Sequence, residues 1–244
     1  MAAPRILVVP GGTSIGAVAL ANASIHKLVE LYEERAADPN HPAPHTVVFV
    51  RDPAKVPPAT LRGSAATPEQ AFPEEDYPGL ANHIKNDPHF FDGVDLVLST
   101  SGSSAGKPRL VGLSTDALMA SVKATELALD GPGRWILALP THHIAGAMIL
   151  VRAAVAGTNP QVVDTTNGFH PRDLLPAIKG VTQDDMPGYL SLVPTQLVQC
   201  LDADEEVLEA LRSLSAILVG GAAISQHLLE RALNAGLKVR ITYG

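Results

Sequence analysis

The segment from Thr100 to Arg109, TSGSSAGKPR, concentrates side chains that could bind phosphate. Its four hydroxyl groups and two cations can donate hydrogen bonds and supply positive charge, and its two glycines let the backbone approach an anion closely. The segment follows a short apolar run and precedes a stretch with a helical pattern. Composition alone leaves two interpretations open, a phosphate-binding loop and a plain turn between secondary-structure elements.

The best-known phosphate loop does not fit this segment. A P-loop NTPase requires four residues between its glycines, and a Ser or Thr directly after the lysine to bind Mg²⁺. Here three residues separate Gly102 from Gly106, and Pro108 follows Lys107. The missing metal ligand excludes that class of enzyme.

Short apolar runs alternate with helical patterns and would position this loop. A helix is expected over residues 15–35, and Ser114 and Ser225 are expected to cap two further helices, the second of which ends at Gly236. Strands are expected over residues 5–9, 46–50, 95–99, 135–139, 161–163, 189–193, 216–219 and 238–242. This alternation predicts an α/β fold, layered, with largely parallel sheets flanked by helices.

Residues 52–92 are rich in proline and hold few sustained apolar patterns, so we expect loops and short helices there. We predict a boundary near Phe91. Residues 1–92 would form an N-terminal α/β portion with a proline-rich connection, and residues 93–244 a core portion that carries the loop.

The overall composition excludes several classes of protein. A net charge of −7 argues against a general nucleic-acid binder. Cys200 is the only cysteine, which suits a reducing compartment, and its apolar neighbours at helical spacing predict burial. Polar residues and prolines interrupt the two apolar stretches, near residue 10 and over 135–157. We therefore expect a cytoplasmic protein without membrane insertion.

Four segments, in this order, resemble the adenylate-forming superfamily of acyl-CoA synthetases, luciferases and peptide-synthetase adenylation domains. They are TSGSSAGKPRLVGLS, LPTHHIAG, LVGGAAIS and the final TYG, which resemble T-S-G-[ST]-T-G-x-P-K-G-V, L-P-x-x-H-x-x-G, G-G-A-x-[IL] and the start of Y-G-x-[ST]-E. SLVPTQL, combined with GGAAI, is especially similar to o-succinylbenzoate–CoA ligases of menaquinone biosynthesis.

The resemblance implies a reaction and a set of site residues. A small carboxylic acid, o-succinylbenzoate, would attack the α-phosphate of ATP, and coenzyme A would then displace AMP, with Mg²⁺ as cofactor. His143 matches the family's acyl-pocket histidine and is the catalytic candidate. Phosphate binding is implied for Thr100, Ser101, Gly102, Ser103, Ser104, Gly106 and Lys107, and adenine or acyl binding for Thr195, Gly220, Gly221, Ala222 and Tyr243. No metal site on protein ligands is predicted, because the histidine pair lacks further ligands at metal-binding spacing.

Each of these residues also has a structural interpretation that stays open. The loop can be a turn, His143 a packed residue, Thr195 a helix N-cap, and Gly220–Ala222 a tight turn after a strand. His142 is given no role. Relative to the family pattern, Ala105 adds one residue to the loop, and Arg109 replaces a lysine.

The family pattern continues beyond Gly244 with a magnesium-binding glutamate, a ribose-binding aspartate and a small C-terminal domain that carries a lysine. We therefore expect the 244-residue chain to be the N-terminal portion of a ligase, without that small domain, and to show little or no turnover alone. A homo-oligomer remains open.

Two other functions remain open. One is a nucleotide- or acyl-binding module without turnover. The other is a Rossmann-type dinucleotide enzyme that uses VVPGGTSIG (residues 8–16), although Thr13 replaces the central glycine and Asp52 lies beyond the usual offset of about 20 residues.

Overall fold

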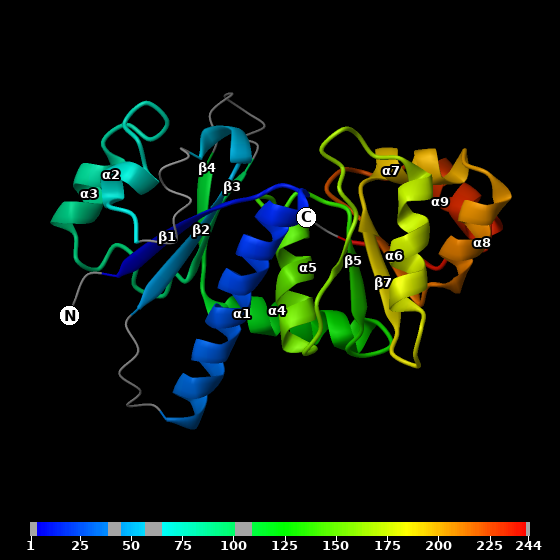
Figure 1. Ribbon diagram of the computed structural model, residues 1–244, viewed down its shortest axis with the longest axis horizontal. Helices are drawn as coiled ribbons and strands as arrows, with labels where there is room; N and C mark the ends of the chain where they lie inside the picture. Colours follow the sequence, from blue (N-terminus) through cyan, green and yellow to red (C-terminus); the bar gives the residue numbers. More distant parts are fainter. Residues whose placement is uncertain (1–3, 39–44, 57–64, 101–108, 243–244) are drawn as a thin grey trace.

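The computed structural model describes residues 4–38, 45–56, 65–100, 109–242 and contains two sheets (Figure 1). In the first sheet the strand order is β1-β2-β3-β4. The first three strands run parallel, and β4 is an antiparallel edge strand. The bounds are Arg5–Pro10 for β1, Thr46–Arg51 for β2, Leu96–Thr100 for β3 and Arg109–Leu113 for β4.

The second sheet is parallel throughout, with strand order β6-β5-β7-β8-β9. Its strands are β5 (Arg134–Leu137), β6 (Gln161–Val162), β7 (Gly188–Leu192), β8 (Ala216–Val219) and β9 (Val239–Ile241). The eight expected strands are all present, with ends shifted by at most two residues. The predicted α/β class with largely parallel sheets is confirmed.

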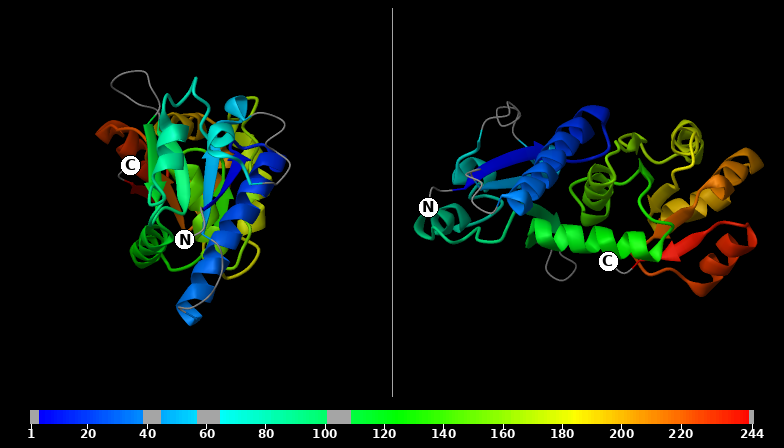
Figure 2. Two further views of the ribbon diagram at one scale, coloured as in Figure 1. Left: turned by 90° about the vertical axis from the view of Figure 1, so that its left-hand side faces the viewer. Right: turned by 90° about the horizontal axis from the view of Figure 1, so that it is seen from below.

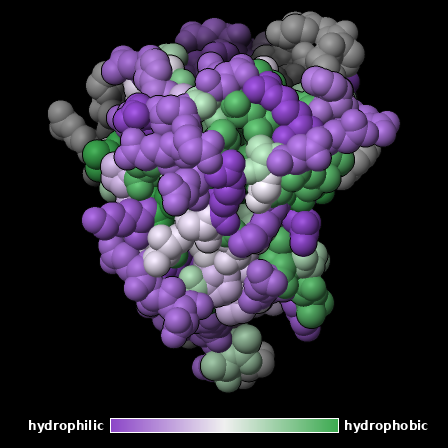
Figure 3. Space-filling view, turned by 90° about the vertical axis from the view of Figure 1, so that its right-hand side faces the viewer, coloured by the Kyte–Doolittle hydropathy of each residue, from purple (hydrophilic) through white to green (hydrophobic). Residues whose placement is uncertain are grey.

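Helices cover both faces of each sheet. The buried side chains of α1 (Ile15–Ala37), α4 (Thr115–Ala128) and α5 (Ile144–Val155) form one core with residues of both sheets. The outer face of the second sheet carries α6 (Leu174–Val181), α7 (Pro194–Leu201), α8 (Glu205–Ser213) and α9 (Gln226–Asn234). Figure 2 shows the resulting layers, and hydrophilic residues cover much of the surface on the side of α7–α9 (Figure 3).

Segment 66–94 packs on the outer face of the first sheet and includes the short helices α2 (Pro68–Ala71) and α3 (Leu80–Asn86). The expectation of loops and short helices is confirmed over the described residues 52–56 and 65–92, which also include the 3₁₀ helix Pro53–Lys55. Arg51 is only 1% exposed, and its Nη2 donates to Oδ2 of Asp76 at 2.7 Å. Strands β3 and β4 join β1 and β2 in one sheet, so the boundary near Phe91 stays a prediction.

Local signals placed the helix ends correctly. The hydroxyl of Ser114 accepts a hydrogen bond from the amide of Ala117 at 3.1 Å, and that of Ser225 accepts one from Leu228 at 3.2 Å. Gly236 has φ +79° just after α9. Cys200 is buried as expected, and burial raises the pKa of its thiol to about 12.

Strand β4 was not expected from the sequence. Its residues are mostly exposed, and it lacks the buried alternation that marks a strand. Gly112 is needed there because a Cβ would lie 2.9 Å from the side chain of Val94. Among the helices of the described ranges, none is long and apolar enough to cross a membrane.

Candidate active site

The site residues predicted in the second sheet lie at one edge of that sheet. His143 follows β5, Thr195 follows β7, and Gly220 directly follows β8. These three strands are parallel neighbours, so their carboxyl ends meet at the same edge. The fold therefore brings together residues that are far apart in the sequence.

The gap between the ends of β5 and β7 is a topological switch point. From β5 the chain leaves through α5 on the inner face and returns to β6, whereas from β7 it leaves through α7 on the outer face towards β8. The two connections diverge, and open α/β sheets bind their ligands at such a switch point. We refer to the region at the carboxyl ends of β5 and β7, bordered by His143 and Thr195, as the β5–β7 crevice.

Two helix N-termini border this crevice. His143 is the N-cap residue of α5 and is exposed, and its backbone amide donates to the carbonyl of Pro140 at 3.1 Å. Thr195 lies in the first turn of α7 and is also exposed. Helix N-termini carry partial positive charge and unpaired N–H groups, so the crevice favours a carboxylate or a phosphate.

The N-cap interpretation of Thr195 is wrong. Helix α7 begins at Pro194 with Val193 as its N-cap residue, and the backbone amide of Val193 donates to Oε1 of Gln196 at 3.1 Å. Nε2 of Gln196 donates to the carbonyl of Ala138 at 3.2 Å. Sequence reasoning missed Gln196, although the quoted SLVPTQL segment contains it.

The turn after β1 supports the histidine segment from the first sheet. A Cβ on Gly11 would lie 2.5 Å from the Cβ of His142, so only glycine fits there. The hydroxyls of Thr13 and Thr165 lie 3.0 Å apart. This packing uses the glycine-rich turn for contacts within the protein, which differs from the open phosphate cradle of a Rossmann site.

The rings of His142 and His143 differ in burial: His142 is half-buried and His143 is exposed. Their ring centroids lie 4.3 Å apart, and Nδ1 of His142 is buried without a hydrogen-bond partner in the described part of the chain. Burial lowers the pKa of His142, the neighbouring His143 lowers it further, and Asp52 opposes the shift. The exposed His143 is the imidazole available to a ligand.

The glycine of LPTHHIAG has a steric role. A Cβ on Gly146 would lie 2.3 Å from the carbonyl oxygen of Pro140. The absence of a side chain lets the first turn of α5 close against the end of the loop. The spacing of Pro140, His143 and Gly146 in this segment is thus a packing requirement that places the histidine.

The turn after β8 also depends on glycine. A Cβ on Gly220 would lie 2.1 Å from the hydroxyl of Thr242, and Gly221 has φ +76°. Ala222 and Gly221 are exposed. The chain bends directly after β8 at Gly221, as a turn interpretation expects, and ligand binding by these residues stays a prediction.

Of the predicted phosphate-binding residues the structure describes only Thr100, which belongs to the first sheet. Thr100 ends β3, and its hydroxyl donates to the carbonyl of Arg109 at 3.3 Å. Since β3 is parallel to β1 and two strands away, Thr100 lies about 10 Å to the side of the turn after β1. The other predicted phosphate and adenine residues lie outside the described residues: Ser101, Gly102, Ser103, Ser104, Gly106, Lys107 and Tyr243.

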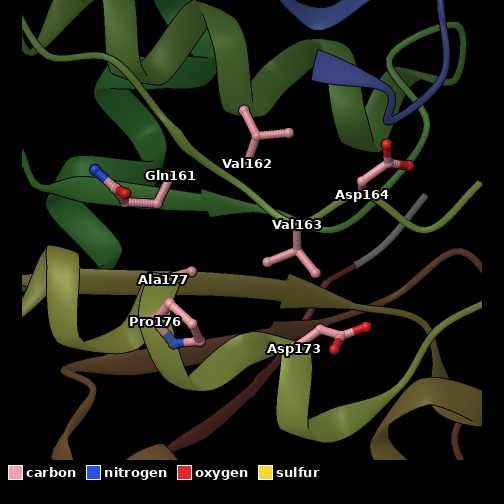
Figure 4. Close-up of a pocket in the computed structure, with 7 residues that line it drawn as sticks. All are labelled: Gln161, Val162, Val163, Asp164, Asp173, Pro176 and Ala177. Carbon is pink, nitrogen blue, oxygen red and sulfur yellow. The ribbon is translucent and has the colours of Figure 1, made fainter.

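A separate hollow of about 330 Å³ lies between β6 and α6 (Figure 4). It is lined by Gln161, Val162, Val163, Asp164, Asp173, Pro176 and Ala177. Asp164 is already engaged, because it accepts a hydrogen bond from the amide of Thr166 at 2.9 Å. None of the predicted site residues that the structure describes lines this hollow.

The sequence model of one enzyme family, the AMP-binding enzymes, matches residues 7–244. The chain belongs to the AMP-binding enzyme family. The match spans both sheets and the β5–β7 crevice, and it confirms the adenylate-forming resemblance of the four segments.

Curated members of the family are similar over parts of the chain. A probable 2-succinylbenzoate–CoA ligase of Mycobacterium tuberculosis (strain H37Rv) is 40% identical over 153 residues, which are 63% of this chain and 39% of that relative. A 2-succinylbenzoate–CoA ligase of Staphylococcus aureus (strain MW2) is 27% identical, over 72% of this chain and 33% of that relative. The matched stretches therefore cover well under half of these relatives.

Solved structures share the fold. The o-succinylbenzoate coenzyme A synthetase of Bacillus subtilis in complex with ATP and magnesium ion has a TM-score of 0.56 at 18% identity, over 99% of this chain and 57% of that one. A malonyl-CoA ligase with methylmalonyl-CoA and AMP bound has a TM-score of 0.56 at 21% identity, over 98% and 51%. The predicted fold, the N-terminal domain of the adenylate-forming enzymes, is confirmed over this chain.

Proposed function

We propose that this chain is the N-terminal portion of an AMP-forming acid–CoA ligase that converts o-succinylbenzoate to its CoA thioester in menaquinone biosynthesis. The observation that carries the proposal is the β5–β7 crevice, where two helix N-termini meet the exposed side chains of His143 and Thr195. The names of the similar curated ligases support o-succinylbenzoate as the acid.

The residues of the crevice suit the first half of the reaction. The imidazole of His143 can donate a hydrogen bond to a carboxylate oxygen, and the N-terminus of α5 stabilises negative charge on it. Holding the acid beside the α-phosphate of ATP supplies proximity and electrostatic stabilisation. The segment from Thr100 to Lys107 would bind the β- and γ-phosphates, with Mg²⁺ neutralising their charge.

The proposed reaction consumes ATP and coenzyme A, and we propose a cytoplasmic location because both are available there. The complete protein, incubated with ATP, Mg²⁺, o-succinylbenzoate and coenzyme A, is expected to release AMP only when both the acid and coenzyme A are present. Aryl and aliphatic acids form the comparison panel. Turnover with another acid and none with o-succinylbenzoate would exclude the named substrate, and nucleotide binding without turnover would favour a binding module.

A further inference from the structure

Gln196 joins the two walls of the β5–β7 crevice. It lies on α7 on one side, and its Nε2 donates to the carbonyl of Ala138, at the end of β5 on the other side. The hydrogen bond is 3.2 Å long and buried, and Gln196 is only 9% exposed. A buried carbonyl that loses its donor is costly, so this bond constrains both walls.

The Gln196–Ala138 hydrogen bond lies just beyond the last backbone pairing between β5 and β7. The register between β5 and β7 extends to the pair Ile136–Leu190, two residues before Ala138. At Ala138 a side-chain amide donates in place of a backbone N–H of a neighbouring strand. Because Oε1 of Gln196 also accepts from the amide of Val193, the side chain has one orientation and fixes the distance between the strand end and α7.

The geometry points to Gln196 as a positioning residue that sets the distance between the end of β5 and α7 and thereby the affinity for the acid. This inference rests on the proposed function. Ala138 is followed by the loop that ends at His143, and Gln196 is adjacent to Thr195 in the sequence. The hydrogen bond from Gln196 to Ala138 therefore fixes the positions of the segments that carry His143 and Thr195 relative to each other. Gln196 itself is buried and acts through these neighbours.

Two variants of the complete protein test this role. Gln196→Met keeps the volume and loses both hydrogen bonds, and Gln196→Glu places a carboxylate against the Ala138 carbonyl. Gln199→Met is the matched control, because Gln199 lies on the same helix and is exposed. We expect the KM for o-succinylbenzoate to rise about tenfold in both Gln196 variants while the KM for ATP stays within about twofold.

The pH dependence separates positioning from general damage. In Gln196→Glu the introduced carboxyl group, when protonated, can donate to Ala138 and restore the bond, and burial favours the protonated form. The acid KM of Gln196→Glu is therefore expected to fall towards the wild-type value as the pH is lowered, whereas that of Gln196→Met stays high. An acid KM in Gln196→Met equal to that of Gln199→Met, or an equal rise for acid and ATP, overturns the inference.

A second measurement does not depend on the reaction. Hydrogen–deuterium exchange of the peptide covering residues 138–146 should be faster in Gln196→Met than in Gln199→Met, and equal exchange overturns the positioning role. If the wild-type protein shows no turnover with o-succinylbenzoate, the proposed function fails, and the exchange experiment still decides whether Gln196 holds the loop.

Discussion

Thr141 makes two hydrogen bonds to the carbonyl oxygen of Gly12, from its backbone nitrogen at 3.1 Å and from its hydroxyl at 3.2 Å. Gly12 follows β1 of the first sheet, and Thr141 follows β5 of the second. Thr141 is completely buried. The contact joins the two sheets beside His143, so the position of the catalytic candidate depends on it.

Thr141→Val removes the hydroxyl and keeps the shape of the side chain. The Gly12 carbonyl then loses one of two donors, and the expected loss in free energy of unfolding is about 1–2 kcal/mol. Thr141→Ser keeps a hydroxyl and should lose less. Denaturant unfolding of the 244-residue chain measures both, and a Val variant as stable as wild type would show that the hydroxyl bond contributes nothing.

Gly146→Ala should disturb the loop that carries His143. The new Cβ would lie 2.3 Å from the Pro140 carbonyl oxygen, a backbone atom that cannot move alone, so we expect a loss of about 1–3 kcal/mol. Gly16→Ala is the matched control, because Gly16 is in α1 with nothing within 4 Å of an added Cβ. That variant should be neutral or slightly more stable. Equal melting temperatures for the two variants would refute the steric role of Gly146.

Arg51→Met should be more destabilising than the loss of an exposed charge. The guanidinium is buried and donates to Asp76 and to the Ala71 carbonyl, at 2.7 and 3.3 Å. Asp76 is 24% exposed, so the carboxylate left behind is reached by water, and losing the charged hydrogen bonds should cost about 1.5–3 kcal/mol. Lys55→Met is the control, since Lys55 is exposed and 3.6 Å from the same carboxylate, and should cost less than about 1 kcal/mol. Similar losses in the two variants would contradict the anchoring of segment 66–94 by Arg51.

The pair His45–Asp95 predicts a pH dependence of stability. The hydrogen bond to Asp95 raises the pKa of His45 against the effect of burial. Burial acts to raise the pKa of Asp95, but hydrogen bonds from His45 and Thr115 outweigh it and lower that pKa. The contribution of His45 to the free energy of unfolding is therefore fully present below a pH of about 6.5, and it is lost as the pH rises through the raised pKa of His45.

The stabilisation that Asp95 contributes has the opposite pH dependence. It is complete above a pH of about 3.9 and is lost as the pH falls through the lowered pKa of Asp95. The stability difference between wild type and His45→Gln should thus be largest near pH 5 and shrink above neutrality. Melting temperatures across this range measure it, and a difference that is constant with pH would rule out the ion pair.

The features that the sequence predicted correctly are those that depend on residues close together in the chain. The apolar runs of the strands and the caps Ser114 and Ser225 are local signals, and all were found. Strand β4 was missed because it is an exposed edge strand. The bond between Gln196 and Ala138 spans 58 positions, and that between Thr141 and Gly12 spans 129, so neither leaves a pattern that one sequence can display.

The candidate site residues came from the resemblance to the family, and the fold explains why two of them lie at the same sheet edge. His143 and Thr195 lie at the same sheet edge because β5 and β7 are parallel neighbours, a relationship that only the strand order reveals. The phosphate segment from Ser101 to Lys107 lies outside the described residues, so its role stays a prediction.

Acid-dependent exchange of pyrophosphate into ATP by the complete protein tests the central claim most directly, because it reports adenylation alone. We expect exchange with o-succinylbenzoate in the wild type, a decrease of about tenfold or more in His143→Ala, and no change in His83→Ala, whose histidine is exposed on α3 on the outer face of the first sheet. Undiminished exchange in His143→Ala would contradict the placement of the chemistry at the β5–β7 crevice, and no exchange in the wild type would contradict the proposed reaction.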